Sequence, residues 1–182
     1  MKKRILLLVV AFAFLSNLNA YELNGDLGVK WTGFKTEKKA PVSGTFNEIN
    51  LNIKNSDKLS DFLTSAKVKI TTASFESKNP ERNTSIVSTL FSLASSKMIE
   101  GTITKVDEKA KTLILDVTMN QVTKAIPMTY EIIEGNIIAK GTIEILDFNM
   151  KDSFLAFAKK CAELHENKSY TDVNIEFTIP FK

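Results

Sequence analysis

The sequence predicts a mainly β fold: an eight-stranded antiparallel barrel with two amphipathic helices in its connections. Eight segments alternate apolar and polar residues with the period of two that a half-buried strand requires. Several links between these segments are short, which implies antiparallel neighbours. Strands of this kind in one modest domain favour closure into a barrel, because closure leaves no exposed edge.

The alternation is clear along the chain. In the second segment, for example, Ile49, Leu51 and Ile53 interleave with asparagine and lysine. The link "EGN" between the sixth and seventh segments carries a glycine, as hairpin turns often do. The expected strands are residues 27–31, 49–53, 66–71, 99–103, 113–119, 126–132, 137–145 and 173–181.

Two long connections show helical spacing instead. Residues 81–96, after the third strand, place Ile86, Leu90 and Phe91 on one face. Residues 151–166, after the seventh strand, place Phe154, Phe157 and Cys161 on one face. We therefore expect one amphipathic helix in each connection.

The N-terminus has the pattern of a cleaved secretory signal. Three basic residues precede eleven apolar ones, and Ala20 is a small residue at the expected cleavage position. Eleven apolar residues span about 16 Å as a helix, too little for a bilayer core of roughly 30 Å. We expect residues 1–20 to be a signal peptide and residues 21–182 to form a single exported domain, located in the periplasm and not spanning the membrane.

The charge balance argues against a nucleic-acid partner. The formal net charge is +3, but removing residues 1–20 takes away three basic residues and no acidic one, which leaves 21 of each. A neutral chain has no excess charge to attract phosphate backbones. Nearly all its basic residues are lysine, which recognises phosphate less well than arginine does.

Catalytic and metal-binding patterns are scarce. His165 is the only histidine and Cys161 the only cysteine, so neither a multi-histidine metal site nor an internal disulfide is possible. Their spacing of four allows a shared helix face, and hence a nucleophile pair, but Cys161 also fits an apolar stripe as a buried side chain. We expect no catalytic residue, no cofactor and no metal, and predict that the protein is not an enzyme.

An apolar interior remains as the candidate binding site. An eight-stranded barrel is either filled by its side chains or holds one small ligand. A buried linear chain gains roughly 0.8 kcal/mol per CH₂, so sixteen carbons would give about 13 kcal/mol before the costs of binding. Arg82, the only arginine after residue 20, either contacts a ligand head group or donates to a surface carboxylate or backbone carbonyl.

Several stretches resemble the YceI-like polyisoprenoid-binding family. They are "VSGTFNEINLNI", "VKITTASFESKNPERNTSIVSTLF", "NQVTKAIPMTYEI" and "ILDFNM", and they follow the family's order over most of the chain. Arg82 and Asn83, at the start of the expected first helix, match an Arg-Asp/Asn pattern of the family. The chain departs from the family in its first strand, in Ile145 where an arginine is usual, and in Asn149 where a glycine is usual.

The resemblance implies a lipocalin-like barrel that binds a long isoprenoid or fatty amphiphile in its pore, in periplasmic proteins that are often homodimers. The first helix would line or close one end of that pore. Combined with the inward positions of the strands, the resemblance gives these ligand-binding candidates: Trp31, Phe34, Phe75, Arg82, Asn83, Ile86, Leu90, Phe91, Met119, Met128, Tyr130 and Phe148.

The sequence thus favours transport or sequestration of a lipid, with other functions still open. One alternative is a packed interaction module without a pore. Another is an enzyme of hydrophobic substrates that uses Cys161 and His165. A third, an outer-membrane barrel, fits poorly, because one Trp and three Tyr make weak aromatic girdles.

Overall fold

The structure is a computed structural model that describes residues 20–182. The predicted signal peptide, except for Ala20, lies outside the described residues. The strands are β1 Gly28–Lys35, β2 Ala40–Phe46, β3 Ile49–Asn52, β4 Lys67–Thr71, β5 Phe75–Glu76, β6 Met98–Asp107, β7 Thr112–Met119, β8 Val122–Ile133, β9 Asn136–Glu144 and β10 Asp172–Pro180.

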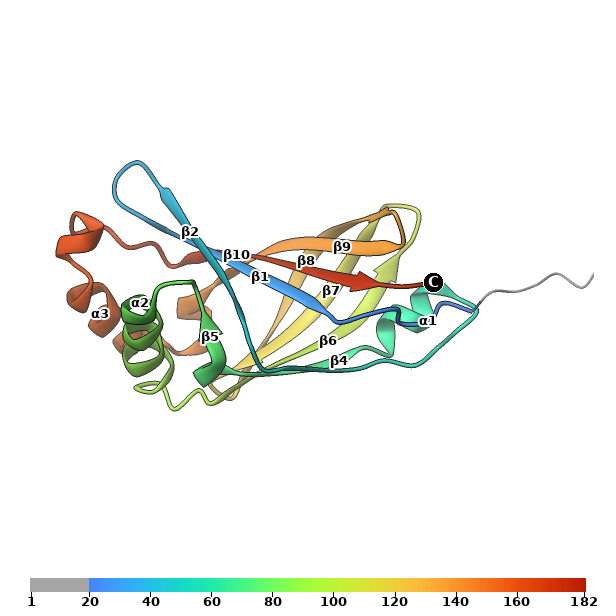
Figure 1. The fold of residues 1–182 in the computed structure, drawn as a ribbon, viewed down its shortest axis with the longest axis horizontal. Helices are drawn as coiled ribbons and strands as arrows, with labels where there is room; N and C mark the ends of the chain where they lie inside the picture. The colour runs from blue at the N-terminus through green and yellow to red at the C-terminus, as the bar shows by residue number, and fades with distance from the viewer. Residues whose placement is uncertain (1–19) are drawn as a thin grey trace, which may run out of the picture.

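The helices gather at the two ends of the molecule. They are α1 Leu59–Thr64, α2 Pro80–Ser85, the π-helix η2 Ile86–Phe91 and α3 Lys151–Lys160, with short 3₁₀ turns at η1 Thr72–Ser74, η3 Ile145–Phe148 and η4 Glu163–His165. Figure 1 shows α2 and α3 together at one end of the curled sheet and α1 near the other. No helix among residues 20–182 is long and apolar enough to cross a membrane.

The strands form one antiparallel sheet in the order β3-β4-β6-β7-β8-β9-β10-β1-β2-β5. The predicted count of eight strands was wrong, since the sheet has ten. The sheet is also a curled half-barrel rather than a barrel closed by a continuous ladder. Its two edges, β3 with four residues and β5 with two, are very short, which limits the unpaired backbone that they expose.

The two missed strands have identifiable causes. Pro41 and Gly44 interrupt the apolar pattern of β2, and a two-residue strand such as β5 is too short to show a period. Only Asn47 and Glu48 separate β2 from β3. Since β3 is one edge strand and β2 lies next to the other, this short link connects the two edge regions of the sheet. The eight strands that were predicted all exist.

The first predicted helix is shorter than expected and changes type. Asn79 caps α2 by accepting a hydrogen bond from the backbone N–H of Arg82 at 2.8 Å, and Pro80 occupies the first turn. The chain then continues as η2 to Phe91 instead of Ser96. Ile86, Leu90 and Phe91 are buried, so this helix covers one end of the sheet.

The second predicted helix also breaks early. α3 ends at Lys160, and the turn η4 follows. The helix α1 was not predicted, because six residues give too few positions for a clear helical period. Its Leu59, Phe62 and Leu63 are buried.

Candidate functional site

The curled sheet and the helices at one end border a partly open cavity of about 500 Å³. This volume lies within the range of small-molecule sites. Because side chains alternate along a strand, each strand that borders the cavity does so mainly with every second residue. The strands supply mainly Val29, Trp31, Gly33, Val68, Ile70, Ile99, Gly101, Ile103, Leu115, Val117, Met119, Ile143, Val173, Ile175, Phe177 and Ile179.

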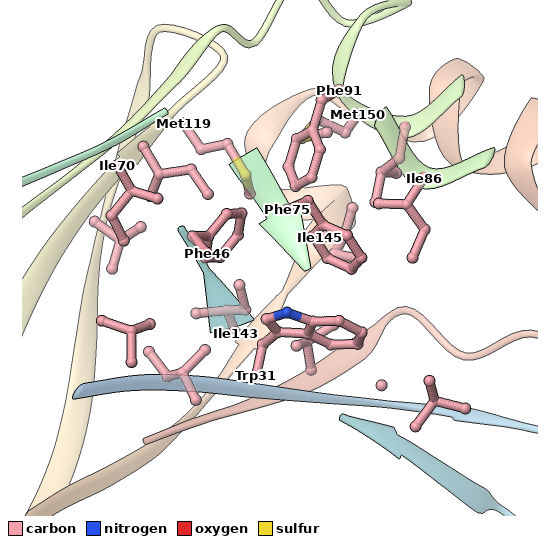
Figure 2. Close-up of a pocket in the computed structure, with 18 of the residues that line it drawn as sticks. Trp31, Phe46, Ile70, Phe75, Ile86, Phe91, Met119, Ile143, Ile145 and Met150 are labelled. Carbon is pink, nitrogen blue, oxygen red and sulfur yellow. The ribbon is translucent and has the colours of Figure 1, made fainter. Parts of the chain in front are cut away.

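Aromatic rings form the wall beneath α2 and η2. The ring of Phe75 lies 4.5 Å from that of Trp31, 5.6 Å from that of Phe46 and 6.2 Å from that of Phe91, measured between centroids. Figure 2 shows Phe75 between Trp31 and Phe91, with Phe46 beside it. The cluster draws on β1, β2, β5 and η2, so it fixes the helical end of the cavity to the sheet.

Most of the predicted ligand-binding residues lie at this cavity, and contact with a ligand stays a prediction for all of them. Eight of the twelve line it: Trp31, Phe34, Phe75, Arg82, Ile86, Leu90, Phe91 and Met119. Four do not: Asn83, Met128, Tyr130 and Phe148.

Three of these four are packed into the core. Met128, Tyr130 and Phe148 are only 2%, 4% and 0% exposed. Met128 lies against Gly141 of the neighbouring strand, where even an added Cβ would stand 2.9 Å from Met128 Cγ. The hydroxyl of Tyr130 is buried and has no hydrogen-bond partner among residues 20–182, and burial raises its pKa.

Asn83 instead joins α2 to β5. Its Oδ1 accepts hydrogen bonds from the backbone N–H of Ser77 at 2.9 Å and from the Ser77 hydroxyl at 2.6 Å. Its Nδ2 donates to the Glu76 carboxylate at 3.2 Å. The backbone N–H of Lys78 and the amide of Asn83 both donate to that carboxylate and hold the pKa of Glu76 below its usual value.

Polar side chains gather where the cavity meets the helical end. Arg82 lines the cavity and donates from Nη1 to the carbonyl of Ser77 at 3.3 Å, so the two interpretations of this residue are compatible. Lys35, at the end of β1, and His165, in η4, line the same end. Ser85 and Tyr170 add hydroxyl groups there.

The Cys161–His165 pair does not form a nucleophile. The two are linked through the backbone, where His165 N–H donates to the Cys161 carbonyl at 3.0 Å. Nδ1 of His165 lies 2.7 Å from the hydroxyl of Ser169, and its ring packs edge-on against Phe157. Cys161 is 7% exposed, and burial raises the pKa of its thiol, which opposes the thiolate form.

Residues 20–182 hold no cluster of three or more His, Cys, Asp and Glu suited to a metal ion. Burial lowers the pKa of His165, and the charges of Lys35 and Arg82 lower it further. At neutral pH this favours the uncharged imidazole. The site can therefore offer a lysine, an arginine and a histidine side chain at the rim of a mainly apolar cavity.

Sequence reasoning missed several lining residues. Phe46 was missed because it lies in β2, a strand that was not predicted. Val173, Ile175 and Phe177 lie in the predicted strand β10, and its alternating pattern already placed them on one face. Phe154 and Phe157 line the cavity from α3 and shared the apolar stripe seen in the sequence. The strand period and the helix stripe were thus sufficient signals for most of them.

Solved structures share this architecture. A polyisoprenoid binding domain from Saccharophagus degradans, implicated in plant cell wall breakdown, is 15% identical, with a TM-score of 0.59 over 90% of this chain and 98% of that one. Burkholderia cenocepacia BcnA is 16% identical, with a TM-score of 0.59 over 85% and 98%. A Campylobacter jejuni YceI protein is 16% identical, with a TM-score of 0.53 over 77% and 84%.

At these identities the likeness concerns the fold. No curated protein matches the chain. The family model described as a YceI-like domain matches residues 20–181, which is nearly the whole of the described chain. The curled antiparallel sheet with its mainly apolar cavity agrees with this match, and the chain belongs to the YceI-like family.

Proposed function

We propose that this protein binds a long-chain isoprenoid or a comparable amphiphilic lipid in the cavity, and that it carries or sequesters this lipid in the periplasm without making or breaking bonds. The observation that carries the proposal is the cavity of about 500 Å³ with a mainly apolar lining. An apolar chain inside it would be removed from water along its length.

Two further observations support a lipid. A structural relative is named as a polyisoprenoid binding domain. Lys35, Arg82 and His165 of the lining lie near one another, so a chain with a polar head group would have a preferred orientation in the site. A solidly packed interaction module would not need such a cavity, and burial raises the pKa of the Cys161 thiol, which does not favour a thiolate nucleophile.

The periplasmic location follows from the pattern of residues 1–20. Tyr21 pairs with Ser56 through its backbone, and its ring packs against Phe62 and Phe181. A mature chain that begins at Tyr21 would keep these contacts. The intact mass of the protein purified from a periplasmic extract tests this, and light scattering tests the predicted homodimer.

The binding experiment combines native mass spectrometry with solvent extraction of protein purified without detergent. We expect an adduct in the native spectrum and a long-chain lipid in the extract. A preparation that never carries a lipid, and that shows no thermal shift with added prenyl chains, would refute the proposal.

A cavity-blocking variant makes this experiment specific. Gly33 lines the cavity, and an added Cβ there would meet no heavy atom within 4 Å. Gly33→Phe should therefore place its ring in the cavity space and carry much less lipid, and circular dichroism checks that the variant is folded. Lys30→Leu, at an exposed position of the same strand, is the control and should carry lipid like the parent protein.

A further inference from the structure

Three basic side chains from separate elements border the same end of the cavity. Lys35 comes from the end of β1, Arg82 from α2 and His165 from η4. All three residues are partly buried, so the charges of Lys35 and Arg82 are not fully surrounded by water. The apolar side chains of Ile86, Phe157 and Leu164 line the cavity beside them.

The partners of these groups within residues 20–182 are uncharged. Lys35 Nζ approaches the carbonyl of Leu164 at 3.5 Å, and Arg82 Nη1 the carbonyl of Ser77 at 3.3 Å. The ion pairs of the described chain involve Lys39, Lys69, Lys140 and Lys182, and neither Lys35 nor Arg82. Glu81 of α2 also lines the cavity, but it is exposed and forms no ion pair with Lys35 or Arg82 within residues 20–182.

The geometry of two of these groups is fixed by the backbone. Lys35 forms an antiparallel bridge with Ser169, and the Ser169 hydroxyl lies 2.7 Å from His165 Nδ1. The next residue, Thr36, donates from its backbone N–H to the carbonyl of Lys168 at 3.1 Å. The end of β1 and the loop after η4 therefore form one unit, which holds Lys35 and His165 on the same side of the opening.

Partly desolvated cations without a counter-charge are costly, and an anion placed between them removes that cost. We propose that this end of the cavity binds an anionic head group, a carboxylate or a phosphate at the end of the apolar chain, between Lys35, Arg82 and His165. The inference rests on the proposed function, because the same chain occupies the cavity. It goes further in assigning the charge of the ligand.

Paired ligands with the same chain test the charge. A long-chain fatty acid is compared with its alcohol, and farnesyl phosphate with farnesol, so that carboxylate and phosphate are separate arms. Trp31, the only tryptophan, lines the cavity and reports binding by fluorescence. We expect at least one anion to bind about tenfold or more tightly than its alcohol, as charge-assisted hydrogen bonds allow.

Variants then test whether the preference for an anion depends on the basic residues at this end of the cavity. Arg82→Gln should weaken the preferred anion about tenfold and leave the alcohol unchanged, while Arg82→Lys should retain part of the preference. Lys109→Gln removes an exposed lysine of the β6–β7 turn, outside the cavity lining, and should change neither affinity.

The pKa of His165 provides a further test, because a merely structural role of the three basic residues would not change it when a ligand binds. It is the only histidine, so its ring signals in an NMR titration need no assignment. The titratable and charged groups bordering it are Lys35 from β1, Arg82 and Glu81 from α2, Cys161 after α3, and Tyr170, with Glu163 and Glu166 on its own turn. An anion among the cations should raise the pKa of His165, and the anion should accordingly bind more tightly as pH falls through that pKa.

The outcomes separate the two ideas. If acid, phosphate and alcohols bind equally, and the pKa of His165 is the same with each, the anionic site is refuted while lipid binding stands. If Arg82→Gln weakens acid and alcohol alike, the residue has only a structural role, and the inference fails. If no ligand of either kind binds, the proposed function fails with it.

Discussion

The indole ring of Trp31 stacks on the ring of Phe75, with centroids 4.5 Å apart and 27° between the ring planes. This contact joins the long strand β1 to the two-residue strand β5, which leads into α2. Trp31 Nε1 also donates to the carbonyl of Thr45 at 3.3 Å. The stack therefore places the helical cover over the sheet and defines one wall of the cavity.

The stack requires a glycine at position 44. A Cβ at Gly44 would clash with the backbone carbonyl of Glu76 and stand 2.6 Å from Trp31 Cζ2. Gly44→Ala should lower the free energy of unfolding by about 1–3 kcal/mol, the usual cost of overpacking. Urea unfolding measures this, with Gly33→Ala as the control, because a Cβ at Gly33 meets nothing within 4 Å. Equal stability of the two variants would contradict the close approach.

Asn83 should prove structural. Asn83→Ala removes its bonds to Ser77 and Glu76 and leaves the polar groups of Ser77 without this acceptor. We expect a loss of about 1–3 kcal/mol in the free energy of unfolding. Thr84→Ala, at the next and exposed position, should cost much less. If Asn83→Ala changed lipid affinity but not stability, the assignment would be wrong.

Glu76 should make the fold sensitive to acid. Its pKa is lowered in the folded state, so its contribution to stability is present above its unfolded pKa and is lost as pH falls through the folded pKa. Thermal unfolding of Glu76→Gln between neutral pH and pH about 3 should show a smaller decrease in Tm than the parent protein, since unperturbed Glu titrates near about 4.3. Parallel Tm curves would argue against this contribution.

The buried hydroxyl of Tyr130 should not stabilise the protein. It has no hydrogen-bond partner in the part of the chain that the structure describes, and Tyr130 is only 4% exposed. Tyr130→Phe should leave the free energy of unfolding unchanged or raise it by up to about 1 kcal/mol. Tyr130→Ala should lower it by about 3–5 kcal/mol because of the space left behind. A clear loss in Tyr130→Phe would reveal a partner for the hydroxyl.

Gly141 and Gly101 show which feature of the cavity could not be predicted from the sequence. Period-two alternation located eight strands but could not tell which inward residues border a space and which fill one. Met128 and Met119 have the same pattern, yet Met128 occupies the gap at Gly141 whereas Met119 lines the cavity. Gly101, by contrast, lies in the cavity wall. That difference depends on the curvature of the whole sheet, which no local pattern encodes.

Local signals served better for the helices. The stripe that placed Cys161 with Phe154 and Phe157 predicted a buried cysteine, and Cys161 is buried. The break after α3 and the π-helix η2 had no clear sequence signal. The sequence singled out Arg82 but did not place Lys35 and His165 beside it. These two residues are far apart in the chain and are brought together by the backbone bridge between Lys35 and Ser169.

The buried cysteine also makes a probe of occupancy. Its raised pKa and low exposure predict slow alkylation by iodoacetamide at neutral pH, faster in denaturant. Since Cys161 lines the cavity, a bound chain should slow alkylation further. Intact mass spectrometry measures the rate at which the single alkylated form appears. Rapid labelling of the folded protein, unaffected by lipid, would contradict this placement.

The central claim is that an apolar chain lies inside the sheet, against Trp31. Titration with a fatty acid brominated along its chain tests this most directly, because bromine quenches tryptophan only at short range and Trp31 is the only tryptophan. We predict saturable quenching at one ligand per protein in the parent and in Lys30→Leu, and strongly reduced quenching in Gly33→Phe. If mass spectrometry shows the brominated fatty acid bound but the fluorescence of Trp31 is not quenched, the lipid binds elsewhere and the claim is contradicted.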